Sequence, residues 1–304
     1  MSGDPNLGKD EIRRAVALAR AGRPAYSHLY DFLEALLVAG AEISGRLHIE
    51  IPSIDDSLAK SKWEKGSPLL NRWDFPIDTA AAQDFLVSIE KSLPGANRQL
   101  AHAYQSLKHS ITIHSERRRE FRRSLLKSET EPLEELLDID SETDPASVLF
   151  LAVSAIKPSL ELTARTLLET HTVPLTWLRG YCPVCGSLPS LLYVYGEGAR
   201  KAFCSWCATR WDLHRLQCPC CENRHHESLG YIGIEEEPQN RIVYCDICKF
   251  YFKQIDLREQ AYVPCLPLEE WTTLHLDLLA RKAGWRQPPS QAPAVYPKTD
   301  SKAD

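Results

Sequence analysis

Apolar residues recur at helical spacing through the first half of the chain. Ile12, Val16 and Ala19 fall on one face of the segment that begins near Lys9, and apolar residues between Leu29 and Leu37 repeat at i, i+3 and i+4. This is the period of an amphipathic helix that packs one face against a core. The pattern continues to about His171 without a cysteine. It therefore predicts an all-helical N-terminal region.

Several helix ends can be placed from capping residues and prolines. Residues 78–79, Asp-Thr, can cap a helix that Pro-Gly at 94–95 ends, and a long, increasingly charged helix is expected over 98–127. The Asp-Pro pair at 144–145 supplies an N-cap followed by proline in the first turn. We expect it to open a buried apolar helix that Pro158 kinks or interrupts, because proline lacks the backbone N–H.

Beyond Val173 the period changes to short runs of β type. Leu191–Tyr195, Arg241–Tyr244 and Phe250–Ile255 read as strands separated by glycine and polar turns. Helical spacing returns over Leu268–Ala283, where Gly284 is placed to end the helix. The chain then becomes rich in proline and polar residues, a composition that predicts disorder.

Four CxxC pairs lie in this second half, and they carry the chemistry. The spacing is CxxC, eighteen residues, CxxC, ten residues, CxxC, twenty-three residues, CxxC. Two CxxC turns that face each other supply the four thiolates of a tetrahedral metal site. The sequence therefore predicts two metal sites, with eight ligands: Cys182, Cys185, Cys204, Cys207, Cys218, Cys221, Cys245 and Cys248.

The spacing leaves three questions open. Sequential pairing of the CxxC turns closes shorter loops and is favoured over interleaved pairing. In the third pair either Cys220 or Cys221 could be the second ligand, and the two-residue spacing favours Cys221. Four thiolates suit iron in a rubredoxin-type centre and zinc in a structural ribbon alike. A full sphere of four sulfurs leaves no position for substrate or water, which argues against metal-dependent hydrolysis.

The fold expected from these patterns is a multidomain α+β protein, with an all-helical domain followed by two rubredoxin-like or zinc-ribbon β modules and a C-terminal helix. We expect the helical domain over residues 1–172, the first module over 173–215, the second module with the C-terminal helix over 216–285, and a disordered tail over 286–304.

Other features have simpler explanations. The histidines His214, His225 and His226 could replace a ligand, but eight well-spaced cysteines suffice. Aromatic residues Trp206, Trp211 and Tyr231 are expected to shield the metal sites. The arginine run over 117–123 is interleaved with glutamates at i, i+4 spacing, typical of a solvated helix face; a docking patch for an acidic partner is the alternative.

Bulk properties narrow the class of protein. The chain has 304 residues, ten cysteines and a net charge of −5, which disfavours nucleic acid as the main partner. Clustered cysteines without a secretory signal indicate metal binding in a reducing compartment, so we expect a cytoplasmic protein with no membrane association. The most apolar run, Ala146–Ile156, is too short to span a bilayer. No P-loop, GxSxG elbow or GxGxxG motif is present.

The amino-acid sequences of the CxxC motifs and of the C-terminal helix resemble those of a known family. YCPVCGSLP from Tyr181, then FCSWCATRWDLHRLQCPCC, YCDICKFYFKQID and EEWTTLHLDLLARKAGW to Trp285 are similar to the formate dehydrogenase accessory proteins, FdhE. The resemblance covers about the last third of the chain. It maps the family's eight motif cysteines onto the eight residues named above, and Cys220 departs from the pattern.

The resemblance implies a cytoplasmic maturation factor with two rubredoxin-like iron sites, zinc being the alternative. Such a protein is not an enzyme; it binds the catalytic subunit of respiratory formate dehydrogenase before export. A zinc-ribbon adaptor for nucleic acid or protein and a rubredoxin-like electron-transfer protein are the alternatives. A homodimer through the helical half is also plausible, since two-fold dimers are the commonest oligomers.

Overall fold

The computed structural model describes residues 7–93, 98–110, 125–126, 143–259 and 264–290. They form two compact units, Met1–Pro52 with Arg72–Thr163 and Ser53–Asn71 with Ala164–Asp304. Each unit is therefore built from two separate stretches of the chain. The segment Ser53–Asn71 belongs with the cysteine-rich half, although it lies far from it in sequence.

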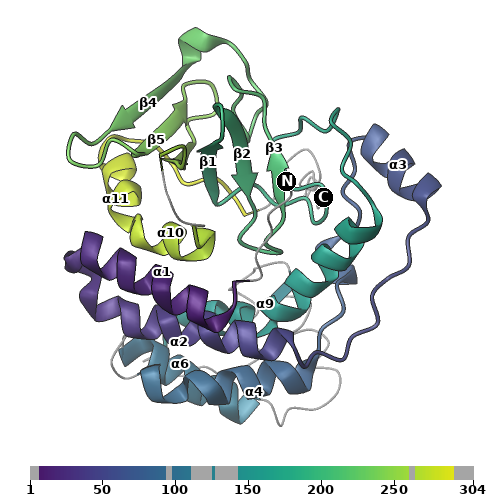
Figure 1. Ribbon diagram of the computed structural model, residues 1–304, viewed down its shortest axis with the longest axis vertical. Coiled ribbons are helices and arrows are strands. Elements are labelled where there is room, and N and C mark those ends of the chain that lie inside the picture. Colours follow the sequence, from purple (N-terminus) through teal and green to yellow (C-terminus); the bar gives the residue numbers. More distant parts are fainter. Residues whose placement is uncertain (1–6, 94–97, 111–124, 127–142, 260–263, 291–304) are drawn as a thin grey trace, which may run out of the picture. The chain divides into compact units, whose positions relative to one another are not determined.

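The first unit is helical (Figure 1). Its helices are α1 (Lys9–Gly22), α2 (Ser27–Ser44), α4 (Thr79–Ile89), α6 (Arg98–Ser110) and the first part of α9 (Pro145–Thr170), with 3-10 turns η1 (Pro24–Tyr26), η2 (Arg72–Asp74) and η3 (Glu90–Ser92). The apolar stripe identified in the sequence faces inward, since Ile12, Val16, Phe32 and Leu33 are buried.

Two of the predicted helix starts are confirmed by side-chain caps. The Asp78 carboxylate accepts hydrogen bonds from the backbone N–H groups of Ala81 (3.0 Å) and His48 (2.8 Å). These donors hold the pKa of Asp78 below its usual range. Asp144 accepts from the N–H of Ser147 at 3.0 Å and thereby begins α9. Each cap satisfies a backbone donor that lacks a partner within the helix.

Helix α9 continues through Pro158, so the expected interruption at that residue is wrong, while a kink there stays a prediction. Proline removes the hydrogen bond that its N–H would donate to the carbonyl of Ser154. Burial of the flanking residues Ile156 and Leu160 holds the helix together across this gap. By length and composition alone α9 could cross a membrane, and 56% of that window is buried inside the protein.

The second unit contains a six-stranded sheet. Its strands are β1 (Leu191–Tyr195), β2 (Ala199–Phe203), β3 (Arg210–Asp212), β4 (Leu229–Gly233), β5 (Asn240–Cys245) and β6 (Tyr251–Asp256), in the order β3-β2-β1-β6-β5-β4. The unit also holds α3 (Asp56–Glu64), η4 (His226–Ser228), α10 (Leu266–Thr272) and α11 (Leu274–Lys282). The mixed α+β fold expected from the sequence is confirmed.

A parallel pairing of β1 with β6 joins the strands of the two cysteine modules. Leu191 lies opposite Lys253, and Val194 lies opposite Asp256. The other strand pairs are antiparallel. Each module is a three-stranded meander, β1–β3 or β4–β6, and the central pair makes one continuous sheet of them (Figure 1).

Alternation along the strands separates the sheet into two faces. One face carries Leu191, Tyr193 and Ile255, which form a buried cluster with Leu266 of α10. Farther along the same face, Ile242 and Tyr251 pack with Leu276 and Ala280 of α11. Helices α10 and α11 therefore cover this face, as the apolar spacing of the C-terminal segment predicts.

The predicted helix end at Gly284 is confirmed. Gly284 has a positive φ of 88°, its N–H donates to the carbonyl of Arg281, and the N–H of Trp285 donates to that of Ala280. This pair of bonds is the Schellman motif, which favours glycine because a side chain strains that conformation. The chain then lies against the modules. Arg286 forms an isolated β-bridge with Phe250, and the carbonyl of Ser290 accepts a hydrogen bond from the N–H of Leu188.

The expected tail over 286–304 is thus structured over its first five residues, which carry backbone hydrogen bonds to both modules. Its remainder, residues 291–304, lies outside the described residues, as does the arginine run over 117–123.

A buried ion pair ties α11 to the sheet. Lys253 Nζ lies 2.9 Å from Asp277 Oδ2 and donates to the carbonyl of Glu270 at 2.7 Å. Tyr251 donates its hydroxyl to Asp277 Oδ1 at 2.9 Å, and burial together with that carboxylate raises the pKa of Tyr251 to about 12. Only 7% of the Lys253 side chain and 18% of the Asp277 side chain are exposed.

Replacing Lys253 by methionine is expected to destabilise the second unit by about 3–5 kcal/mol, because Asp277 is left as an unpaired, mostly buried charge. Urea unfolding followed by tryptophan fluorescence measures this. The control is Lys60→Met, whose partner Glu64 lies 4.0 Å away on an exposed helix surface. Equal unfolding midpoints for the two variants would contradict a structural role for the pair.

Candidate metal centres

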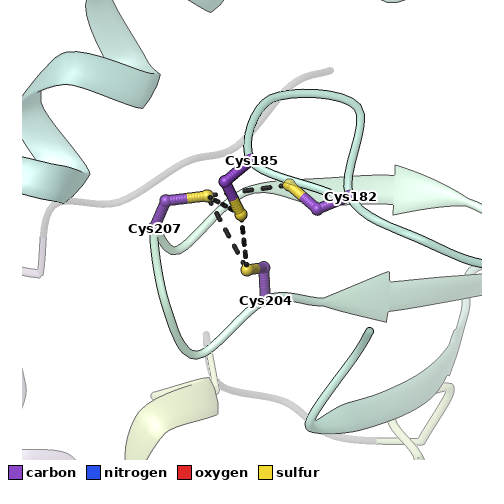
Figure 2. Close-up of side chains that lie close together, drawn as sticks. All are labelled: Cys182, Cys185, Cys204 and Cys207. Atoms are coloured by element: carbon purple, nitrogen blue, oxygen red, sulfur yellow. Dashed lines mark hydrogen bonds between the residues drawn. The ribbon is translucent and has the colours of Figure 1, made fainter. Parts of the chain in front are cut away.

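The first group of cysteines is fully buried. The sulfur atoms of Cys182, Cys185, Cys204 and Cys207 lie within 4.8 Å of one another, and each residue is at most 1% exposed. Cys182 and Cys207 are 3.6 Å apart, as are Cys185 and Cys204, while Cys207 lies 3.5 Å from Cys185. Figure 2 shows the four side chains pointing toward one common point.

The second group brings together Cys218, Cys221, Cys245 and Cys248, again within 4.8 Å. Cys218 lies 3.6 Å from Cys248, and Cys221 lies 3.7 Å from Cys245. The first CxxC turn thus faces the second and the third faces the fourth, as expected for sequential pairing. Cys218 and Cys245 are buried, but Cys248 is half-buried and Cys221 is exposed.

Every CxxC turn is built on the same two backbone hydrogen bonds. The N–H of its first cysteine donates to the carbonyl five residues later: Ser187, Thr209, Asn223 and Phe250, at 2.8–3.1 Å. The residue directly after the second cysteine donates its N–H back to the carbonyl of the first cysteine, at 2.8–3.0 Å. This closes a tight loop that turns both sulfurs to one side.

The residue after the second cysteine has a positive φ in all four turns. These residues are Gly186 (73°), Ala208 (57°), Glu222 (56°) and Lys249 (61°). Only Gly186 indicates this conformation in the sequence, because the left-handed conformation costs a residue with a side chain about 1–2 kcal/mol. Side-chain contacts hold two of the others: Glu222 pairs with Arg179 at 3.0 Å, and Lys249 pairs with Asp246 at 2.8 Å.

The repeat places Cys221, and not Cys220, at the second position of the third turn. Glu222 follows Cys221 with the same backbone geometry as the three other turns. Cys220 is not one of the four sulfurs of either group; it is half-buried, and its thiol is hydrogen-bonded to Cys248 at the edge of the second group. Within the described residues, His214, His225 and His226 also belong to neither group.

The donor set fits a cation. A tetrahedral ion with sulfur ligands at about 2.3 Å requires about 3.8 Å between the sulfurs. The sulfur separations given above for both groups, 3.5–3.7 Å, are close to this value. Burial raises the pKa of the Cys182 and Cys207 thiols well above their ordinary value. Four thiolates can therefore be held together in the first group only with a cation to balance them.

Polar groups around the first group suit sulfur ligands. The N–H of Val184 donates to Cys182 Sγ at 3.4 Å, while the hydroxyls of Ser187 and Thr209 lie 3.0 and 3.1 Å from Cys185 and Cys207. Hydrogen bonds of this kind stabilise a buried thiolate. The sequence analysis did not single out Ser187 and Thr209; their signal is a hydroxyl two residues after each of the first two CxxC pairs.

A distant segment supports the first CxxC turn. Leu69 donates its N–H to the carbonyl of Pro183, and Leu70 donates to Val184, both at 2.9 Å. The indole of Trp63, at the end of α3, donates to the same Pro183 carbonyl at 3.0 Å. The backbone between the two cysteines is thus fixed by residues more than a hundred positions earlier, for which the sequence gives no local signal.

The aromatic residues expected near the clusters behave differently from one another. Trp206 and Trp211 are buried, and the indole of Trp211 donates to the carbonyl of Arg179 at 3.1 Å. Tyr231 is 68% exposed. Shielding by the three expected aromatic rings is therefore confined to the first module.

Comparison with known proteins identifies relatives along almost the whole chain. No protein-family model matches it. The FdhE homologue of Aquifex aeolicus is 27% identical over 292 residues, 93% of this chain and 95% of the relative. The homologue of Rhizobium meliloti is 31% identical over 115 residues, 36% of this chain and 37% of the relative.

The crystal structure of the FdhE protein from Pseudomonas aeruginosa has the same fold, with a TM-score of 0.63 at 22% identity over 93% of this chain and 94% of that one. Near full-length similarity to one homologue, this shared fold and the two groups of four cysteines agree with the resemblance of the motifs. The chain is similar to FdhE proteins along almost its whole length.

Proposed function

We propose that the protein is a metal-containing, non-catalytic accessory factor for formate dehydrogenase. The observation that carries the proposal is the pair of four-cysteine groups in a chain that is similar to an FdhE homologue along almost its whole length. Four sulfur ligands complete a tetrahedral sphere, so an ion held there has no open position for a substrate. Sites of this kind either stabilise the local fold or transfer an electron. They therefore suit a protein that binds another protein better than one that catalyses hydrolysis.

The ligands in this proposal are the eight cysteines of the two groups. The ions are iron in two rubredoxin-like centres, with zinc as the alternative, since a tetrahedral set of four sulfurs accepts both. Sulfur separations near those of a tetrahedral site support ligation in each group.

The partner in this proposal is the catalytic subunit of respiratory formate dehydrogenase, bound in the cytoplasm before export. Similarity to an FdhE homologue and the resemblance of the motifs support this partner. Cytoplasmic placement is supported by ten cysteines that form no disulfide among themselves, the state expected in a reducing compartment.

The first prediction separates two neighbouring thiols. Cys221→Ser is expected to lower the metal content from two ions per chain to one, because it removes a ligand of the second group. Cys220→Ser, its matched control, is expected to keep two. Elemental analysis of untagged protein measures both; a loss of metal in Cys220→Ser alone would assign the ligand to Cys220.

The second prediction concerns the unequal burial of the two groups. A chelator or an alkylating reagent is expected to reach the second centre at least tenfold faster, because Cys221 is exposed whereas the first four cysteines are at most 1% exposed. Mass spectrometry of alkylated peptides over time distinguishes the two. Equal rates would show that global unfolding, not local access, limits release.

The third prediction tests the partner. The tagged chain is expected to co-elute with the formate dehydrogenase catalytic subunit, and Cys182→Ser, which opens the buried centre, to weaken that complex. Cys220→Ser serves as the control with an intact pair of centres. Separate elution, together with normal formate dehydrogenase activity in a strain lacking the gene, would refute the proposed function.

A further inference from the structure

A pocket opens on the sheet face opposite α10 and α11. Its volume is about 330 Å³, and its walls include Val194, Arg200, Arg241, Val243 and Phe252. The strand register explains this lining, because Val194 lies opposite Arg200, Arg241 opposite Gln254, and Val243 opposite Phe252. The volume is at the lower end of the range for small-ligand pockets.

The charge of this pocket contrasts with that of the chain. Four arginines line it, Arg200, Arg215, Arg241 and Arg258, and none of its lining residues is acidic, although the chain has a net charge of −5. Arg258 is neutralised by Asp256, whose carboxylate accepts from its Nε at 2.8 Å. The other three form no salt bridge with any carboxylate among the described residues.

These three arginines are held in different ways. Arg200 donates from Nε to Gln254 at 3.0 Å and from Nη1 to the carbonyl of Gln217 at 2.7 Å. Arg241 lies 5.5 Å from the centre of the Tyr231 ring. Arg215 is exposed and contributes its backbone carbonyl to Arg200. Arg200 thus fixes the loop that carries Arg215, and the two remaining guanidinium groups border the pocket.

The surroundings of Arg200 also indicate a need for negative charge. Burial lowers its pKa to about 10, and Arg241 adds to this effect by repulsion. Cys218, which lines the pocket, acts in the opposite sense.

We propose that this pocket binds a small organic phosphate, with the phosphate at Arg215 and Arg241 and the organic part over Val243 and Phe252. Guanidinium groups match phosphate oxygens in pairs. Two unpaired positive charges also balance a phosphate monoester, which carries about −1.5 to −2 at neutral pH. Val243 and Phe252 form an apolar floor, which an inorganic phosphate ion would not contact favourably but an organic group would. The site is independent of the proposed function and lies at the edge of the second cysteine group.

Isothermal titration calorimetry on the full-length, metal-loaded chain tests this site. Adenosine monophosphate, inorganic phosphate and a glutamate-rich peptide are titrated in separate arms. The variants are Arg215→Gln and Arg241→Gln, with Arg281→Gln as control, since Arg281 lies on α11 and bonds Gln287. We expect adenosine monophosphate to bind, each pocket variant to weaken it at least tenfold, and the control to leave it unchanged. Inorganic phosphate should bind more weakly.

Four results would overturn the proposal. Adenosine monophosphate could fail to bind at millimolar concentration, or bind equally well to all variants. The glutamate-rich peptide could bind more tightly, which would make the pocket a protein-docking site. Loss of metal from either pocket variant would assign the arginines to balancing the thiolates. Arg215→Gln keeps the test independent of folding, because its side chain is exposed and its backbone makes the contact to Arg200.

Discussion

The convergence of four sulfur atoms at each centre is the constraint on which the second unit depends. In the first centre the thiols lie 3.5–3.7 Å apart and are removed from water, so they resist ionisation, and a cation reverses this preference by stabilising all four charges together. The repeated loop geometry serves that end. Three of its four turns place a residue other than glycine in the left-handed conformation. The conformational energy cost of these three residues is accepted because the turn directs both of its sulfur atoms toward the centre.

The two centres share a sheet but differ in environment. The parallel pairing of β1 with β6 means that neither three-stranded meander has a free edge at the junction. The first centre lies beside hydroxyl groups and buried indoles, whereas the second borders solvent and an arginine-lined pocket. One architecture, used twice, therefore gives a buried centre and an accessible one. The second unit thus combines one cysteine group that is closed to solvent with one that solvent can reach.

Local patterns predicted much of the fold. Leu191–Tyr195 is a strand with the predicted bounds, Asp78 and Asp144 begin helices, and Gly284 ends one. The cysteine spacing predicted both groups and their sequential pairing, because short loops close with little loss of entropy. The interruption predicted at Pro158 is wrong, since buried packing on both sides outweighs one missing hydrogen bond. The joined sheet, the arginine pocket and the Ser53–Asn71 segment depend on contacts between distant residues, which no local pattern encodes.

The hydrogen bond from Trp63 to Pro183 has a consequence for biosynthesis, because its ends are 120 residues apart. At a ribosomal rate of about 5–20 residues per second, the indole waits about 6–24 s for its acceptor to be made. During that interval the carbonyls of Pro183 and Val184, to which Trp63, Leu69 and Leu70 donate, do not yet exist. The contacts of α3 and the segment after it with the first CxxC turn therefore form only once that turn has been synthesised.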